Sequence, residues 1–211
     1  MQGYLARLNQ SLARPLGATP RLLVLAAALL LVAVYIFPLW NLTMFAPQYP
    51  EGLRLDIYSY KLAGGNADQD LKEINILNHY IGMRDLVVDD FTEFKWLPFI
   101  VGALGLLYLR SAVMGTVGGL VDVLVLNGYF SLFALWSFGY RMYLYGHTLA
   151  PTAAVKVDPF MPPMFGGKQL ANFEVYSYPQ AASYAMALSS LLLVVALVVA
   201  WRQARAGLQA A

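Results

Sequence analysis

Only two histidines occur in this 211-residue chain, and one of them, His79, is followed by a methionine four residues later. On a helix this spacing would present the imidazole of His79 and the thioether of Met83 on neighbouring turns of one face. Imidazole and thioether are ligands that suit Cu(I). His147 and two methionines of a Pro-rich segment, Met161 and Met164, are further candidates for such a copper site. The alternative interpretation is that the histidines are ordinary hydrogen-bonding residues and that the methionines pack or contact a partner.

Catalytic motifs are missing from the sequence. It has no cysteine, no G-x-S-x-G motif and no phosphate-binding loop, and its two histidines are the only imidazole bases. We therefore expect a protein that is not an enzyme on its own, without disulfides. The net charge of +2 and the lack of a basic patch also argue against binding of nucleic acid.

The composition places the candidate residues in a membrane protein. The chain is 59% hydrophobic and 12% charged, whereas soluble domains carry about 25% charged residues. Four apolar segments can cross about 30 Å of hydrocarbon as helices if flanking charges reach the interface. They cover residues 22–40, 95–113, 120–141 and 181–201. The sequence therefore predicts a mainly α-helical membrane protein, a four-transmembrane-helix bundle in contact with the lipid bilayer.

The distribution of arginines predicts the orientation of these helices. Short segments that carry or adjoin basic residues lie in the cytoplasm; they are 1–21 and 202–211, which carry arginines, and the turn 114–119, which follows Arg110. The long connections 41–94 and 142–180 then face outward, so we expect a multi-pass protein of the bacterial inner membrane with both termini in the cytoplasm and both loops in the periplasm. Asp122 falls near the cytoplasmic end of its helix, where a solvated or paired acid is expected rather than a proton relay.

The two long connections contain patterns of regular structure. Leu53, Leu55 and Ile57 alternate with polar residues, which is typical of a strand, and "NFEVYSYP" predicts a second strand. Between them, residues 70–83 have apolar positions at helical spacing, with Asp68 or Asp70 as the N-terminal cap. We expect strand, helix and strand to pack together as a small extracytoplasmic α+β cap. On the helical wheel, the apolar residues Ile74, Leu77 and Ile81 lie opposite Asn75, His79 and Met83.

Four stretches of the sequence occur together: "FPLWNLTMFAPQYPEGLRLDIY", "INILNHYIGM", "YGHTLAPTAAVKV" and "PPMFGGKQLANF". They resemble a family of small bacterial four-helix membrane proteins associated with gene clusters for the Sec-type nitrous oxide reductase, a copper-dependent respiratory enzyme. The resemblance covers about residues 37–179. His79, Met83, His147, Lys168 and Asn172 fall within its strongest phrases. Before the "YGH" phrase the family has an acidic residue, and this chain has Leu144, which puts any role for an acid there in doubt.

Three functions follow as expectations. The first is an accessory or anchoring subunit that docks a periplasmic copper enzyme of the nitrous oxide reductase type, because aromatic and Met-rich loops suit an interface. The residues expected at that interface are Tyr80, Phe160, Phe165, Lys168 and Asn172. The second is a copper-delivery protein that uses the candidate ligands named above. The third is a quinol-interacting electron-transfer partner, with its site among the tyrosines near His147.

Overall fold

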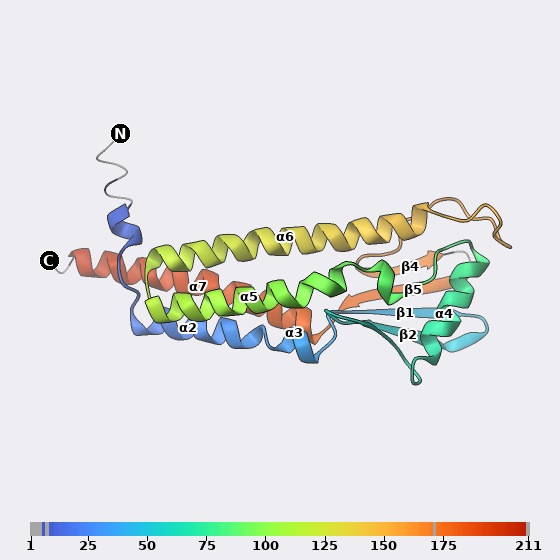
Figure 1. The fold of residues 1–211 in the computed structure, drawn as a ribbon, viewed down its shortest axis with the longest axis horizontal. Coiled ribbons are helices and arrows are strands. Elements are labelled where there is room, and N and C mark those ends of the chain that lie inside the picture. Colours follow the sequence, from blue (N-terminus) through green and yellow to red (C-terminus); the bar gives the residue numbers. More distant parts are fainter. Residues whose placement is uncertain (1–5, 7–8, 171, 210–211) are drawn as a thin grey trace. The chain divides into compact units, whose positions relative to one another are not determined.

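The computed structural model describes residues 6, 9–170 and 172–209, which fold into two compact units. The helix unit comprises the described residues of Met1–Ala33, Phe99–Ser131 and Tyr184–Ala211, and the sheet unit comprises those of Val34–Pro98 and Leu132–Ser183. The helices are α2 (Ala18–Leu30), α3 (Ala33–Ile36), α4 (Gln69–Tyr80), α5 (Glu93–Met114), α6 (Val117–His147) and α7 (Ala181–Gln209), and a 3-10 turn covers Val88–Asp90. The strands are β1 (Trp40–Ala46), β2 (Tyr49–Ile57), β3 (Leu62–Gly64), β4 (Gly166–Leu170) and β5 (Phe173–Pro179) (Figure 1).

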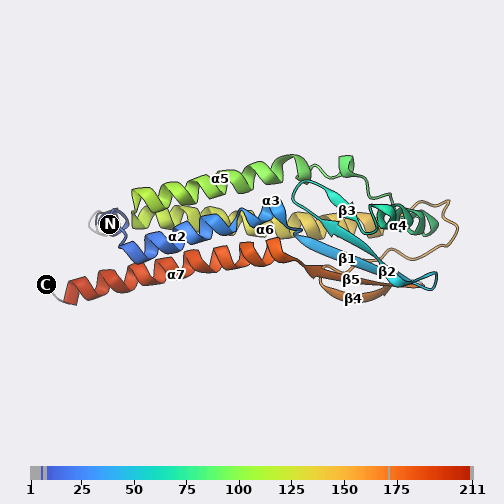
Figure 2. The same ribbon diagram turned by 90° about the horizontal axis from the view of Figure 1, so that it is seen from below.

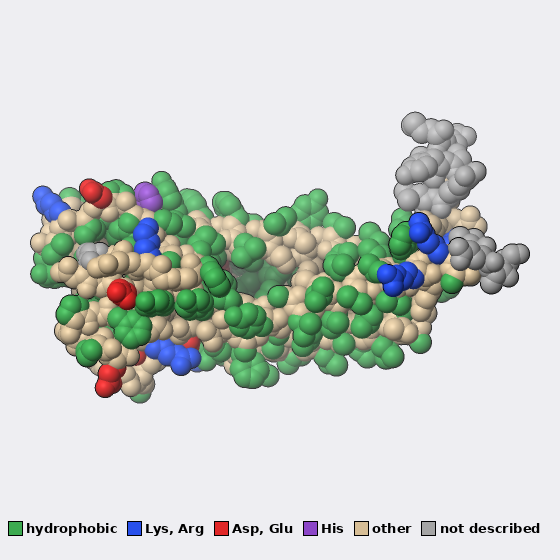
Figure 3. Space-filling view, turned by 180° about the vertical axis from the view of Figure 1, so that it is seen from behind, with side chains coloured by type: hydrophobic (Ala, Val, Ile, Leu, Met, Phe, Trp, Pro, Cys, Tyr) green, Lys and Arg blue, Asp and Glu red, His purple; other side chains and the backbone are tan. Residues whose placement is uncertain are grey.

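Four helical segments of the described chain are long and apolar enough to cross a membrane, which confirms the prediction of a multi-pass membrane protein. They are Ala18–Ile36, Glu93–Met114, Val117–His147 and Ala181–Ala206. On the face in Figure 3, hydrophobic side chains cover the helices, and most charged side chains lie over the sheet unit or near the chain ends. This distribution is the one expected where lipid surrounds the helices.

Two helix ends differ from the prediction. The first helical segment was expected to run to Trp40, but it ends at Ile36, and Trp40 begins β1. Pro38 accounts for this difference, because the residue before a proline is disfavoured in helical conformation. The third long helix was expected to end at Arg141, but α6 continues to His147. Its last turns are stabilised by burial of Met142 and Tyr145 within the sheet unit.

A layer of polar side chains joins all four helical segments inside the helix unit. The Tyr108 hydroxyl of α5 donates to Asn127 Oδ1 of α6 (2.6 Å), and Asn127 Nδ2 donates to Ser190 Oγ of α7 (2.9 Å). Ser189 of α7 donates to the carbonyl of Ala27 in α2 (2.7 Å). Interhelical hydrogen bonds in lipid contribute about 0.6 kcal/mol each on average. The layer therefore fixes the register of the helices more than it stabilises them.

The sheet unit contains one five-stranded antiparallel sheet in the order β3-β2-β1-β5-β4. The strands β1, β2 and β3 come from the first long connection, and β4 and β5 come from the second (Figures 1 and 2). The central strand β1 pairs with β2 on one side and with β5 on the other. The sequence predicted strands around Leu53–Ile57 and Phe173–Pro179, which are present as β2 and β5, but it did not predict β1, β3 or β4.

Alternating side chains give the sheet one buried face. In β5, Phe173, Val175 and Ser177 are buried, and the residues between them are exposed. The helix α4 packs against β2 and β3. It contributes Ile74 and Leu77 to the same core, as its apolar spacing predicted. This core contains Ala46, Leu53, Leu55, Leu62, Ile74, Leu77, Ile81, Phe91, Tyr145, Leu170, Phe173 and Val175.

The acidic residues near the start of α4 do not cap it as predicted. Asp68 occupies the N-cap position, but its side chain makes no capping hydrogen bond and accepts from the backbone N–H of Gly64 instead (2.7 Å). Asp70 is buried and accepts from the N–H of Arg54 (2.9 Å) and from Asn66 Nδ2 (2.8 Å). Both carboxylates therefore fasten the start of α4 to the β2–β3 region.

Candidate functional site

The stretch with His79 and Met83 is not one continuous helix, so the helical-wheel prediction is wrong for Met83. The helix α4 ends at Tyr80, and Gly82 adopts a left-handed conformation with φ of 78°. The N–H of Gly82 donates to the carbonyl of His79 (3.1 Å), and that of Met83 donates to the carbonyl of Asn78 (2.8 Å). These two bonds form a Schellman motif, which ends helices where glycine supplies the left-handed residue. Met83 then packs against the core, while His79 is exposed.

The second long connection holds this helix end in place. Ala150 donates its N–H to the carbonyl of Gly82 (2.8 Å), and Val155 donates to the carbonyl of Tyr80 (3.0 Å). A Cβ atom on Gly82 would lie 2.9 Å from the carbonyl oxygen of Ala150. The position therefore requires glycine for both its backbone conformation and its close contact.

His147 is the last residue of α6, and its imidazole is exposed. Its Nδ1 lies 2.9 Å from the carbonyl oxygen of Tyr143, and the two rings stack with centroids 3.9 Å apart. Because a carbonyl can only accept, Nδ1 carries the proton in this arrangement. The free Nε2 is therefore the nitrogen that His147 can offer to a ligand.

The predicted copper ligands come from three segments of the sheet unit: the end of α4, the end of α6 and the Pro-rich segment before β4. Met161 and Met164 are half-buried, and their backbone carbonyls accept hydrogen bonds from Lys168 Nζ (3.0 Å) and Ser177 Oγ (3.1 Å), respectively. No hydrogen bond or ring contact links these methionines to His79 or His147 among the described residues. The described chain also holds no group of three or more His, Cys, Asp and Glu side chains arranged to bind a metal ion.

Four of the five residues expected at a docking interface are on the surface of the sheet unit. Tyr80 and Phe165 are 54% and 69% exposed, and the side chains of Lys168 and Asn172 are exposed as well. Phe160 differs from the prediction because it is half-buried against the core. Its backbone N–H donates to the carbonyl of Gly146 (3.0 Å), which holds the Pro-rich segment against α6.

An aromatic strip lies on the solvent-facing side of the sheet, and the sequence reading missed it. It consists of Phe45, Phe165, Tyr176 and Tyr178. Successive side chains of a strand point to opposite faces, so Tyr176 and Tyr178 lie on the face opposite to buried Val175 and Ser177. Phe45 is directly opposite Glu174 and therefore lies on the same face as these tyrosines. Phe45 contacts Tyr176 edge to face with centroids 5.8 Å apart, and Phe165 contacts Tyr178 in the same way at 5.4 Å.

Two glycines hold rings of this strip against the sheet. Gly167 of β4 is directly opposite Tyr176, and a Cβ atom there would lie 2.7 Å from the tyrosine ring. A Cβ atom on Gly52 would lie 2.8 Å from the ring of Phe45, and the φ of Gly52 is 85°. Rings that lie over glycine lose rotational freedom before any partner binds, so this part of the strip is rigid in advance.

The neighbouring part of the same face is polar. Asn41 Nδ2 donates to Asp56 Oδ1 (2.8 Å), and Thr43 Oγ1 donates to Asn41 Oδ1 (2.9 Å). Arg54 Nε donates to Asp56 Oδ2 (3.0 Å). The face thus combines exposed aromatic rings with a polar margin, as protein interfaces do.

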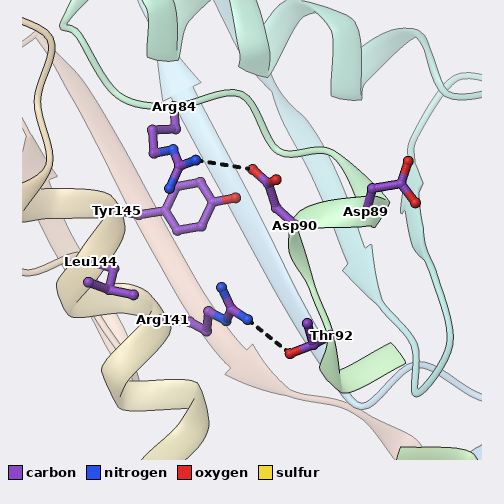
Figure 4. A pocket seen from close by; sticks show the side chains of 7 residues that line it. All are labelled: Arg84, Asp89, Asp90, Thr92, Arg141, Leu144 and Tyr145. Carbon is purple, nitrogen blue, oxygen red and sulfur yellow. Dashed lines mark hydrogen bonds and ion pairs between the residues drawn. The ribbon is translucent and has the colours of Figure 1, made fainter. Parts of the chain in front are cut away.

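A cavity of about 340 Å³ opens within the sheet unit, between the end of α6 and the segment that precedes α5. Its lining residues are Arg84, Asp89, Asp90, Thr92, Arg141, Leu144 and Tyr145 (Figure 4). Arg141 donates from Nε to Glu93 Oε1 (3.0 Å) and from Nη2 to Glu93 Oε2 (2.9 Å). Glu93 also accepts from Ser137 Oγ (2.8 Å). This bidentate pair fastens α6 to the start of α5.

Both guanidinium groups of this cavity are already paired with carboxylates. Arg84 Nη2 lies 3.9 Å from Asp90 Oδ2, and Arg141 forms its ion pair with Glu93. Because three carboxylates, those of Asp89, Asp90 and Glu93, stand against two guanidinium groups, the cavity does not favour an anion. Leu144 also lines the cavity.

A second pair links α4 to the sheet outside the membrane-spanning segments. The Tyr49 hydroxyl donates a short hydrogen bond to Glu73 Oε2, and Gln69 Nε2 donates to Glu73 Oε1 (3.0 Å). The bond from Tyr49, followed by that from Gln69, lowers the pKa of Glu73 below its ordinary value. The same bond raises the pKa of Tyr49. The Glu73 carboxylate is therefore charged at neutral pH and serves as an acceptor.

In comparisons with known proteins, no family model matches the chain, no curated protein matches it, and no solved structure matches it.

Proposed function

We propose that this protein is an integral-membrane accessory subunit that docks a periplasmic copper-dependent respiratory enzyme, of the nitrous oxide reductase type, to the bacterial inner membrane. Four helical segments anchor the chain in the bilayer. The sheet unit would provide the docking surface on the periplasmic side.

The observation that carries the proposal is the aromatic strip. Tyr178 and Phe165 are 42% and 69% exposed, although the sheet unit has a well-packed core on its other face. Tyrosine and phenylalanine are enriched at protein interfaces and among the residues that dominate binding energy. Exposed rings held in place by neighbouring rings and glycines suit a docking role, because little side-chain entropy is lost on binding.

The class of the partner rests on the resemblance of residues 37–179 to membrane proteins associated with nitrous oxide reductase. The strip itself supports a protein partner and does not identify its cofactor. Lys168 and Asn172, which belong to the strongest of the resembling phrases, are exposed in and after β4. They lie near Phe165 in the chain, so this phrase contributes one ring of the strip.

The test compares two tyrosines of equal exposure. Tyr178 lies in the strip and Tyr60 lies in the turn after β2, and each is 42% exposed. The detergent-solubilised chain is immobilised, and binding of purified nitrous oxide reductase is measured. We expect Tyr178→Ala to weaken binding about tenfold or more, since truncation of a central interface residue costs about 2 kcal/mol. Tyr60→Ala should bind like the wild type.

Equal binding by all three proteins would contradict docking through the strip. The copper content and quinone content of the same preparations separate the other functions. Copper in the wild type that is lost in His79→Ala, with the enzyme still bound, would favour copper delivery. A quinone that co-purifies with the chain would favour electron transfer from quinol.

A further inference from the structure

The turn that joins β2 to β3 lies beside the end of the first helical segment that can cross a membrane. Ser59 of this turn is fully buried, and its hydroxyl donates to the carbonyl of Val34 (3.0 Å). Val34 belongs to the last turn of the segment Ala18–Ile36. The preceding strand end is held as well, because Leu39 donates its N–H to the carbonyl of Ile57 (2.8 Å). The turn is therefore fixed at the level where this segment ends.

A second segment that can cross a membrane begins at the same level. The Tyr35 hydroxyl donates to the carbonyl of Pro98, in the second turn of α5 (2.6 Å). Tyr35 and Phe37 are 39% and 46% exposed, and Trp96 lies in the first turn of α5. Tyrosine and tryptophan are enriched where membrane helices meet the lipid headgroups. Segment ends and aromatic residues thus place the β2–β3 turn in the headgroup layer.

Three side chains of this turn form a cluster of two rings and one cation: Tyr58, Tyr60 and Lys61. Lys61 Nζ lies 4.9 Å from the ring centroid of Tyr58 and 5.8 Å from that of Tyr60. Cation–π attraction acts within about 6 Å of a ring centroid. The backbone closes the turn, because the N–H of Tyr58 donates to the carbonyl of Lys61 (2.9 Å). The ammonium group is therefore held in place by the turn itself.

No carboxylate of the described chain neutralises this ammonium group. The ion pairs of the described residues join other side chains, and none includes Lys61. Lys61 is exposed, and Tyr60 is 42% exposed. An ammonium group has three N–H donors, and phosphate is an acceptor that every phospholipid headgroup offers. A basic residue near an anionic membrane surface gains about 1 kcal/mol.

We propose that Tyr58, Tyr60 and Lys61 bind the phosphate group of a membrane phospholipid, with a preference for anionic over zwitterionic phospholipids. The Lys61 ammonium donates to the phosphate oxygens, and the two rings hold the ammonium in the headgroup layer. The proposal rests on insertion of the helical segments in a bilayer. It is independent of the aromatic strip and of the enzyme that would dock there.

The first test measures the depth of the turn in phosphatidylcholine nanodiscs. The chain has no cysteine, so Tyr60→Cys and Glu51→Cys each provide a single site for a nitroxide spin label. Glu51 is exposed near the opposite end of β2, about 20 Å from Ile57 along the strand. Oxygen concentrates in lipid, and a charged nickel complex stays in water. We expect a higher ratio of oxygen to nickel collisions at position 60 than at position 51.

The second test measures the lipid contact of Lys61 in the wild-type chain. Acylation of each lysine is read by mass spectrometry in maltoside detergent, in phosphatidylcholine nanodiscs and in nanodiscs that also contain phosphatidylglycerol. A phosphate beside an ammonium favours the charged form, and only the neutral amine reacts. We expect Lys61 to react more slowly in phosphatidylcholine than in detergent, and about fivefold more slowly than in detergent with phosphatidylglycerol present.

Lys72 is the matched control for this measurement. It is an exposed lysine of α4, and its neighbour Glu73 bonds to Tyr49 at the other end of β2. Lys72 should therefore react at the same rate in all three media.

Variants of the rings separate a binding site from the general charge of the bilayer. In the double variant Tyr58→Leu/Tyr60→Leu the cation–π contacts are lost, so Lys61 should lose most of its protection by phosphatidylglycerol. Tyr60→Phe keeps the ring and should keep the protection. Ser59 retains its bond to Val34 in these variants, so the turn should stay in place.

Four outcomes would overturn the proposal. Equal collision ratios at positions 51 and 60 would remove the turn from the headgroup layer. Equal reactivity of Lys61 in detergent and in both kinds of nanodisc would exclude a lipid contact. Equal protection in the double variant and the wild type would leave only the surface potential of the bilayer. Protection by inorganic phosphate in detergent, without lipid, would assign the cluster to a free phosphate instead.

Discussion

Gly146 lies in the last turn of α6, against the backbone of the Pro-rich segment. A Cβ atom on Gly146 would lie 1.8 Å from the carbonyl oxygen of Phe160 and 2.9 Å from its carbonyl carbon. Ordinary contact begins at 3.4 Å, so Gly146→Ala requires the two backbones to separate by about 1.6 Å. The separation would break the hydrogen bond from the Phe160 N–H to the Gly146 carbonyl (3.0 Å) and loosen Phe160 from the core.

The expected change in the free energy of unfolding is the balance of two opposing effects. Overpacking strain and the lost hydrogen bond together cost about 2–4 kcal/mol. Alanine favours a helix over glycine by about 1 kcal/mol. We therefore expect Gly146→Ala to destabilise the sheet unit by about 1–3 kcal/mol. Gly128→Ala is the matched control, since it makes the same substitution in the same helix but meets open space, and it should be neutral or slightly stabilising.

Hydrogen exchange of the purified chain in detergent, read by mass spectrometry, gives the local free energy of opening. The amides of β5 and of the Pro-rich segment should exchange faster in Gly146→Ala than in the wild type. Their exchange in Gly128→Ala should be unchanged. If Gly146→Ala protects these amides as well as the wild type does, the close packing of α6 against Phe160 is refuted.

Three further predictions concern topology, the core and pH. A reporter fused after Ala211 should be active only in the cytoplasm, because four spans and the arginine distribution place both termini there; activity in the periplasm would contradict an even number of spans. Leu77→Asp buries an unpaired carboxylate in the core and should cost several kcal/mol; the sheet unit should become protease-sensitive while the helices remain inserted, and unchanged protease resistance would rule out this core. Tyr49→Phe should raise the pKa of Glu73, measured by carbon NMR of the carboxyl group, toward its ordinary value. Because the folded-state pKa of Glu73 is lowered, its contribution is complete above the unfolded-state pKa and is lost as the pH falls through the folded-state value. Wild type and Tyr49→Phe should therefore converge in stability in acid, and a difference that persists there would contradict this role of Glu73.

The membrane helices and one face of the sheet could be predicted because their signals are local. Uncharged runs of span length identify the helices, and alternation of Leu53 and Leu55 with polar residues identifies β2. The start of β1 at Trp40 was assigned to the first helix, because a continuous apolar run is compatible with either a helix or a strand. Pro38 was the usable signal, since helices usually end before the residue that precedes a proline.

The site around His79 shows how a single glycine changes a prediction. The helical wheel places Met83 beside His79 on the assumption that the helix continues to Met83. Gly82 is a residue that typically ends a helix. Recognising Gly82 as a stop would have moved Met83 into the core. The pair of Glu93 and Arg141 could not be found in this way. Its members are 48 residues apart and meet only through the tertiary fold.

The aromatic strip depends on strand pairing that no single segment reveals. Phe45, Phe165 and Tyr178 come from different parts of the chain and share one face only because β1 lies beside β5. The strand β4 is one of the two edges of the sheet, and its Lys168 is directly opposite Val175 and donates to the carbonyl of Met161. A lysine on an edge strand discourages pairing with another strand. A protein partner is therefore expected to bind the face of the sheet, where the rings are held in place, rather than the β4 edge.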